Sequence, residues 1–310
     1  MPTHNFPSPE AHAAAVQNAN LRLTLLRKSC APWTMRSLVL PHLRAQWGQA
    51  GGGNLVEGTV GPGGAMLFVP TQNVQVIQFD GRRFGTQTFR LQMPGDELCL
   101  SSTDWHCWFS VFIPNELVAE WSGAGTAAAA RSSRFIQVPS ERAEALRHVV
   151  AQLGSIVERA PLAFESSVAV DTTARKLTES IREAIWGPPI ATNQPGRCPI
   201  SRQQIVRTTM DFIDRRDGEY LTVADLASAA GVSDRTLRSA FQDYFGIGPA
   251  RYLKLRTLNQ IRKALQNADP SVTTVTGVAT QFGVWELGRF ARDYQLLFDE
   301  LPSETLRHVR

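Results

Sequence analysis

The chain has 310 residues, which is long enough for two domains that each bury their own core. Its formal net charge of +4 and its pI of about 9.1 are compatible with binding to a polyanion. No run of about 18 apolar residues could span a membrane, and no basic segment leads into an apolar core as in a signal peptide. We therefore expect a cytoplasmic protein. The four cysteines have no C-x-x-C spacing, which argues against structural zinc and against a disulfide framework.

The first half of the chain has the pattern of a β-rich domain. We expect residues 1–19 to be disordered. From residue 20 to about residue 138, short apolar stretches alternate with polar residues and are separated by turn dipeptides such as Asp80-Gly81 and Pro94-Gly95. The clearest stretches are Val74–Phe79, Phe89–Met93, Leu98–Leu100 and Trp108–Ile113. This pattern predicts a meander of strands that forms a small barrel or sandwich.

Three arginines in this region are candidate effector-binding residues. Arg82 and Arg83 lie beside a predicted turn, and Arg90 lies on the strand that follows it. Guanidinium groups bind phosphate or carboxylate in a forked geometry. One hypothesis is therefore an anionic effector, with a nucleotide second messenger as an example. The alternative is a solvated hairpin with no ligand.

A metal site is not predicted. On a strand, Asp104, His106 and Trp108 share one face because alternate residues point to opposite sides. A catalytic metal in a barrel would need two or three histidines with a carboxylate, and the strand region offers His42 and His106. We therefore predict no metal, no cofactor and no catalytic residue.

Two amphipathic helices and a linker follow the strands. Ser140 could cap the first helix, in which Leu146, Val150, Leu153 and Val157 keep helical spacing, and a second helix is expected from about Glu165 to Trp186. The pair either packs on the barrel or forms a dimer interface. The effector and dimerisation domain would then span residues 20–186. Residues 187–199 contain four prolines and are predicted to be the interdomain linker.

The last third of the chain contains one helical unit twice. Leu237, Phe241, Phe245 and Pro249 are matched 53 residues later by the same kinds of side chain, which are Phe290, Tyr294, Phe298 and Pro302. Ser201 with Gln204 is predicted to open the first helix of this region by a capping box. The repeat predicts an all-helical domain over residues 200–310, with two units that each read as helix, sharp turn and helix.

The first unit has an outward face suited to reading DNA bases. Thr222 and Asp225 predict a capping box, Gly231 predicts the turn, and Ser233 is a suitable N-cap for the next helix. On that helix the polar side chains that fall opposite the apolar stripe, or beside that face, are Arg235, Thr236, Arg238, Ser239 and Gln242. Such side chains on the second helix of a helix-turn-helix pair read base edges in a major groove.

The second unit has fewer hydrogen-bonding groups on its outward face. Gly283 makes the predicted turn, and the outward residues are Gly288, Arg292 and Gln295, with Trp285 and Arg289 on one flank. This face is better suited to binding the phosphates of the DNA backbone. The joining helix, about 16 residues from Arg251 to Gln266, rises about 24 Å. It would let the two units reach successive major grooves, with Arg251 and Lys254 as further phosphate contacts.

These residues carry a family resemblance. Leu221–Gly231, Phe241–Pro249, and the closing Gly283, Trp285, Gly288–Tyr294, Phe298 and Pro302–Glu304 resemble the DNA-binding domain of the AraC/XylS family of transcriptional regulators. The resemblance covers about 110 residues and implies base contacts by Arg235, Arg238 and Ser239. It also implies a cupin-like effector barrel, a homodimer and contact with RNA polymerase as expectations. Leu287 and Gly288 depart from the polar residues that the family often has.

The sequence thus predicts an α+β protein, with a β-rich barrel and two helices followed by an all-helical DNA-binding domain. The function expected is a transcriptional regulator that binds double-stranded DNA and responds to a small-molecule effector. One alternative makes the N-terminal domain a protein-interaction module without a small ligand. A more distant alternative is a barrel enzyme with a helical accessory domain, and a helical interaction bundle is the alternative to DNA binding.

Overall fold

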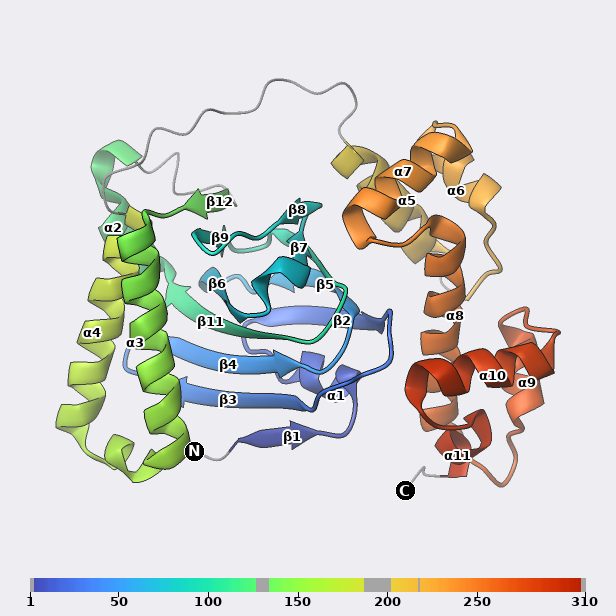
Figure 1. Cartoon of the computed structure of the whole chain (residues 1–310), viewed down its shortest axis with the longest axis horizontal. Helices are drawn as coiled ribbons and strands as arrows, with labels where there is room; N and C mark the ends of the chain where they lie inside the picture. The colour runs from blue at the N-terminus through green and yellow to red at the C-terminus, as the bar shows by residue number, and fades with distance from the viewer. Residues whose placement is uncertain (1–2, 127–133, 187–201, 217, 308–310) are drawn as a thin grey trace.

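The computed structural model describes residues 3–126, 134–186, 202–216 and 218–307. The N-terminal half contains two antiparallel sheets, and the C-terminal half is helical (Figure 1). The predicted β-rich and all-helical halves are therefore confirmed. The predicted linker, residues 187–199, and the predicted cap Ser201 lie outside the described residues.

The two sheets pack face to face around an apolar interior. The seven-stranded sheet runs in the order β1 (His4–Phe6), β3 (Trp33–Val39), β4 (Arg44–Ala50), β11 (His106–Pro114), β6 (Gly64–Gln72), β9 (Thr88–Gln92) and β12 (Arg134–Gln137). The five-stranded sheet runs in the order β2 (Ala19–Leu25), β5 (Asn54–Val60), β10 (Glu97–Ser102), β7 (Ile77–Phe79) and β8 (Arg82–Arg83). The first part of the predicted strand before Phe79 is a 3-10 turn, η1 (Val74–Val76), instead.

The predicted turn at Asp80-Gly81 is confirmed. Both residues have positive φ, 48° and 72°, which matches the two-residue hairpin turn that Asp-Gly favours. It joins β7 to β8, and β8 pairs back on β7 through Phe79 and Arg82.

The N-terminal segment is ordered from residue 4 to residue 14, so the expected disorder over residues 1–19 is wrong there. Helix α1 (Pro9–Ala14) follows β1, and its N-terminus is capped by the Ser8 hydroxyl, which accepts from the Ala11 amide. His12 anchors it, because its ring packs edge-on against Phe6, Trp33 and Trp108. These aromatic contacts bury His12, and the sequence of so short a helix does not predict them.

The two predicted amphipathic helices are present as α3 (Ser140–Arg159) and α4 (Ser167–Trp186), joined by η3 (Pro161–Glu165). They lie along the seven-stranded sheet on the side away from the C-terminal helices, next to α2 (Asn115–Thr126) (Figure 1). Leu146, Val150 and Leu153 share one buried cluster with Phe109 and Val111 of β11. Ser140 is not the cap, since Pro139 occupies that position and the Ser140 hydroxyl donates to Glu144.

The C-terminal half contains seven helices within the described ranges. They are α5 (Arg202–Arg215), α6 (Val223–Ala230), α7 (Asp234–Phe245), α8 (Pro249–Gln266), α9 (Val275–Gln281), α10 (Leu287–Phe298) and α11 (Pro302–Arg307). Helix α8 runs between two groups of helices, with α5, α6 and α7 at one end and α9, α10 and α11 at the other (Figure 1).

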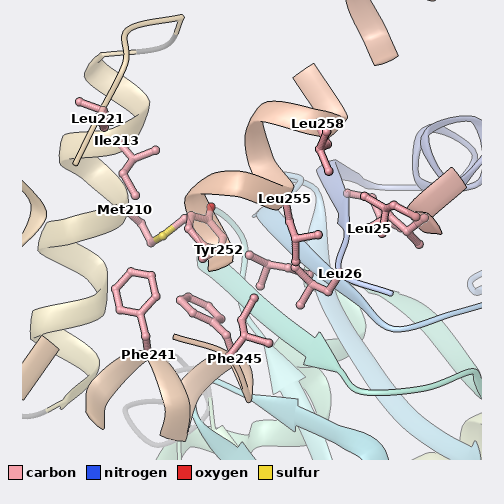
Figure 2. Packing of buried hydrophobic residues seen from close by; sticks show 14 of the residues in the cluster. Leu25, Leu26, Met210, Ile213, Leu221, Phe241, Phe245, Tyr252, Leu255 and Leu258 are labelled. Carbon is pink, nitrogen blue, oxygen red and sulfur yellow. The ribbon is translucent and has the colours of Figure 1, made fainter. Parts of the chain in front are cut away.

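One apolar core crosses from the N-terminal half into the C-terminal half. Leu25 and Leu26 belong to the same buried cluster as Tyr252, Leu255 and Phe245 (Figure 2). The core of the helical half therefore extends to residues of the N-terminal half, which the expectation of one core for each domain did not include. Helical periodicity predicts which residues of α8 are buried, but it does not predict which part of the protein covers them.

Candidate nucleic-acid interface

The first helix-turn-helix unit is formed by α6 and α7, and its local geometry is set by its caps. The Thr222 hydroxyl accepts from the Asp225 amide at 3.3 Å, and the Asp225 carboxylate accepts from the Thr222 amide at 2.8 Å, which completes the predicted capping box. Gly231 ends α6 in the left-handed conformation with φ 64°. Ser233 caps α7 by accepting from the Thr236 amide.

Helix α7 separates an apolar face from a polar face. Leu237, Ala240, Phe241, Tyr244 and Phe245 are buried, as their spacing predicts. The opposite face holds the side chains expected to read bases, and all of them are exposed: Arg235, Thr236, Arg238, Ser239 and Gln242. Within the described ranges, neither Arg235 nor Arg238 has an ion-pair partner, so both guanidinium groups are available to a ligand.

The second unit is formed by α9 and α10. Phe290, Tyr294 and Leu297 are buried, and Phe298 is half-buried against the same cluster. The residues expected on the outward face are exposed: Gly288, Arg289, Arg292 and Gln295. Trp285 is 78% exposed, and Leu287 at the first turn is 36% exposed. This outward face is therefore more apolar than the face of α7.

Helix α8 holds the two units apart. Its 18 residues correspond to a rise of about 27 Å. Arg251 is exposed, whereas the Lys254 ammonium lies 2.6 Å from the Asp293 carboxylate on α10. Arg289 also pairs with Glu286, at 3.4 Å. Exposed pairs of this kind are weak, so both cations can exchange their carboxylate partners for phosphate.

The C-terminal end of α7 docks on the five-stranded sheet. The Ser101 hydroxyl of β10 donates to the Tyr244 carbonyl at 2.8 Å, and the Gln78 amide, with its nitrogen facing α7, donates to the Asp243 and Tyr244 carbonyls. These donors satisfy carbonyls that have no partner inside the helix. Gly81 lies so close to the Tyr244 ring that a β-carbon there would be 2.5 Å from it.

Ion pairs surround this docked contact. Arg22 of β2 lies 2.9 Å from Asp214 of α5, and Arg207 of α5 lies 2.8 Å from Glu97 of β10. The sequence did not predict these partners, because they are separated by more than a hundred residues and carry no shared motif.

The three arginines expected to bind an effector are in different environments. Arg90 is 7% exposed, its guanidinium lies 2.8 Å from the Asp80 carboxylate, and it stacks over the rings of Phe79 and Phe135. Burial lowers the pKa of Arg90. Arg82 and Arg83 are exposed on β8. Arg82 and Arg90 line a cleft of about 1400 Å³ between the five-stranded sheet and α5, so the structure brings these two together while Arg83 does not line the cleft.

His106 has a histidine neighbour that the sequence did not reveal. His12 and His106 are both buried, and burial is the main cause that lowers the pKa of each to about 4. Among the residues that the structure describes, no group of three or more His, Cys, Asp or Glu side chains could hold a metal ion. His12 was missed because it lies in the segment expected to be disordered. Nor is any described helix both long enough and apolar enough to cross a membrane.

Comparison with known proteins places the helical region in a family. A family model described as a helix-turn-helix domain matches residues 226–308. A probable thc operon regulatory protein of Rhodococcus erythropolis is 41% identical over 105 residues, which cover 34% of this chain and 32% of that protein. The XylDLEGF operon transcriptional activator of Pseudomonas putida is 35% identical over 101 residues, which cover 33% of this chain and 32% of that protein. The chain thus matches about a third of the length of these curated relatives.

A solved structure is similar over about a third of the chain. A probable AraC family transcriptional regulator from Rhodopseudomonas palustris is 36% identical over 34% of this chain and 97% of that chain, with a TM-score of 0.32. A TM-score of this size does not establish that the two whole chains share a fold. The two helix-turn-helix units, the joining helix and the sequence matches agree: the C-terminal region of this chain belongs to the AraC-type helix-turn-helix family.

Proposed function

We propose that this protein is a sequence-specific DNA-binding transcriptional regulator. The observation that carries the proposal is the exposed face of α7, where Arg235 and Arg238 have no ion-pair partner within the described chain and lie beside Ser239 and Gln242. A recognition helix with such a face enters a major groove. Relatives of the C-terminal region named as operon regulators support the same reading.

The first unit would supply most of the base contacts. Arg235 and Arg238 can each donate two hydrogen bonds to the O6 and N7 atoms of guanine. Ser239 and Gln242 add shorter polar groups that can donate to or accept from a base edge. Thr236, whose hydroxyl lies 2.9 Å from the Ser233 hydroxyl, would add a further contact to the bases beside these residues.

The second unit would set the register on the duplex. Helix α8 holds it at a rise of about 27 Å from the first unit, and adjacent major grooves on one face of a duplex are about 34 Å apart. The difference is of the order of a side-chain length. Arg289, Arg292 and Gln295 of α10, together with Arg251 and Lys254 of α8, would contact phosphates, which fix position without reading sequence.

The N-terminal domain would regulate this binding. A small-molecule effector can shift the placement of the DNA-binding helices only if it binds one placement more tightly than another. An anionic effector would contact Arg82, Arg83 and Arg90, and of these the exposed Arg82 and Arg83 are free to meet it at least cost. Replacing both with Ala and titrating candidate anions tests this part, because unchanged affinity would remove these residues from the site.

Assembly is also part of the proposal. α3 and α4 expose Ile156 and Val168 at 40% and 72%, which supports a homodimer through these helices. The protein would work in the cytoplasm, with RNA polymerase as a further partner. The alternative, an N-terminal protein-interaction module without a small ligand, predicts that no metabolite stabilises the full chain in a thermal-shift screen.

Selection from a random pool of duplexes tests the DNA-binding function directly. We expect enrichment of one sequence with two conserved segments about one helical turn apart, and protection of both segments on the same face of the duplex. Binding that falls with salt in the same way for every sequence would show only attraction to phosphate. That result would overturn the proposal of specific recognition.

A further inference from the structure

The two faces of the five-stranded sheet have different surroundings: one lines a cavity and the other contacts the helical half. On β2, Leu21 and Leu23 line a cavity between the two sheets, while Arg22 between them pairs with Asp214 of the helical half. On β10, Leu98 and Leu100 line the same cavity, while Ser101 donates to α7. Alternate residues of a strand point to opposite faces. One sheet therefore forms both a wall of the cavity and the surface on which the DNA-binding helices dock.

The cavity is small and mostly apolar. Its volume is about 70 Å³, and its walls include Trp33, Val56, Met66, Phe68 and Trp108 in addition to the leucines of β2 and β10. Pockets for drug-sized ligands are larger, roughly 300–1,000 Å³. An occupant must therefore be compact.

Two polar groups at the cavity have no partner. The Gln92 Nε2 and the Asn54 Oδ1 atoms are buried without a hydrogen bond in the described part of the chain, and both residues are 1% exposed and line the cavity. A buried donor or acceptor left unpaired costs free energy. The cavity thus offers one donor and one acceptor to whatever fills it.

The cavity has no charged group. Its lining contains no Arg, Lys, Asp or Glu, and its two histidines, His12 and His106, are neutral near pH 7 because burial lowers the pKa of each to about 4. Burying an ionised ligand beside such walls would cost far more than burying a neutral one. This site differs from the arginine-lined cleft on the other face of the sheet.

We infer that this cavity binds a compact neutral molecule, with an apolar body, one hydrogen-bond acceptor for Gln92 and one donor for Asn54, and that its occupancy alters the docking of the DNA-binding helices. The cavity exceeds the volume of one water, about 30 Å³ at liquid density, so it has room for a molecule of a few non-hydrogen atoms. The regulatory part of this inference rests on the proposed function, whereas the binding part does not.

Occupancy has a short path to the docked helices. Leu23 lines the cavity, and two residues further along β2 the backbone of Leu25 hydrogen-bonds to Asn259 of α8. Leu100 lines the cavity, and the next residue, Ser101, holds the end of α7. Because protein interiors are close-packed, a ligand that moves these leucines moves the contacts beside them.

The experiment compares two probes of the same shape on the full-length chain. Propionamide is neutral and carries both hydrogen-bonding functions, whereas propionate is its anionic counterpart. We expect calorimetric binding and a rise in Tm with propionamide but not with propionate. Gln92→Met should weaken propionamide binding about fivefold, Ser110→Leu should abolish it by filling the cavity, and Gln75→Met, at an exposed position, should leave it unchanged.

The regulatory readout is the affinity for the selected duplex with and without propionamide. We expect a change in the wild-type chain and none in Ser110→Leu. Equal binding of both probes, or binding that survives both Gln92→Met and Ser110→Leu, would overturn the site. The absence of propionamide binding would also overturn the site, because the cavity would then hold only water. Probe binding by a chain that binds no duplex would instead reject the proposed function and keep the site.

Discussion

The side-chain amide of Asn259 forms two hydrogen bonds with the backbone of Leu25. The Leu25 amide donates to Asn259 Oδ1 at 3.0 Å, and Asn259 Nδ2 donates to the Leu25 carbonyl at 3.1 Å. Asn259 lies on the helix that joins the two DNA-binding units, and Leu25 ends the strand β2 of the N-terminal half. This pairing gives the docked arrangement one defined register, because a shift of α8 by one residue would break both bonds.

Replacing Asn259 should loosen the two halves. In Asn259→Leu, the backbone amide and carbonyl of Leu25 lose their partner next to an apolar core, and each unpaired buried group costs about 1–3 kcal/mol. We expect a lower free energy of unfolding in urea and faster proteolysis between the halves. Asn267→Ala is the control, since Asn267 follows the same helix and its exposed side-chain amide donates to the Lys263 carbonyl. Equal loss in both variants would show that the pairing does not hold the interface.

A side chain at position 81 should disturb the packing of α7 against the five-stranded sheet. Gly81 has φ 72°, and an added β-carbon would lie 2.5 Å from the Tyr244 ring. Gly95 has a similar φ of 78°, but an added β-carbon there would meet no atom within 4 Å. Gly95→Ala therefore measures the backbone cost alone, about 1–2 kcal/mol. We expect Gly81→Ala to lose more stability than Gly95→Ala, as measured by thermal unfolding. Similar losses would mean that the Tyr244 ring moves aside without cost.

Loss of one guanidinium from α7 should weaken specific recognition. Arg238→Ala should cost about 1–3 kcal/mol of binding free energy at the selected duplex and relax the base preference at one position. Fluorescence anisotropy with selected and scrambled duplexes measures both effects. Arg44→Ala, which removes an exposed arginine of β4 in the N-terminal half, should leave both affinities unchanged. Parallel losses on the two duplexes after Arg238→Ala would assign that arginine to phosphate.

Stability should fall as the medium is acidified below neutrality. Burial lowers the pKa of His12 and His106 to about 4 from 6.5, so the unfolded chain binds more protons than the folded chain between these values. The stabilisation is fully present above pH 6.5 and is lost as the pH falls toward 4, by about 3 kcal/mol for each histidine.

The histidine contribution must be separated from that of buried carboxyl groups. Burial raises the pKa of Asp80 and Glu57, which gives their contribution the opposite sign. Comparison with His12→Phe isolates one histidine, because Phe keeps a ring between Trp33 and Trp108 and does not titrate. We expect the variant to show about half of the wild-type histidine-dependent loss in urea titrations between pH 7 and pH 5. Superimposable curves would mean that His12 does not contribute.

The sequence predicted best what neighbouring residues decide. The capping box at Thr222 and Asp225, the turn at Gly231 and the buried stripe of α7 each depend on side chains within a few turns of helix, and all three are confirmed. The exposure of Arg235 and Arg238 followed from the same periodicity. Such features need no knowledge of what lies elsewhere in the chain.

The sequence predicted poorly what depends on distant partners. Arg90 was expected to bind a ligand, but it is paired with Asp80 and stacked on Phe135. Phe135 lies opposite Arg90 on β12, the strand that pairs with β9. His12 packs against Trp33 and Trp108, and no periodic pattern in so short a helix predicts these contacts. The contact between Leu25 and Asn259 joins positions 234 residues apart, and only the tertiary fold brings them together.

A core that crosses the boundary between the two halves limits how such a chain can be rearranged by recombination. Tyr252, Leu255 and Leu258 of α8 are covered in part by Leu25 and Leu26, so a helical half grafted onto an unrelated sensor would present these side chains to water. A functional chimera would therefore have to inherit β2 and β10 together with the helices. The unit of exchange is larger than the helix-turn-helix pair itself.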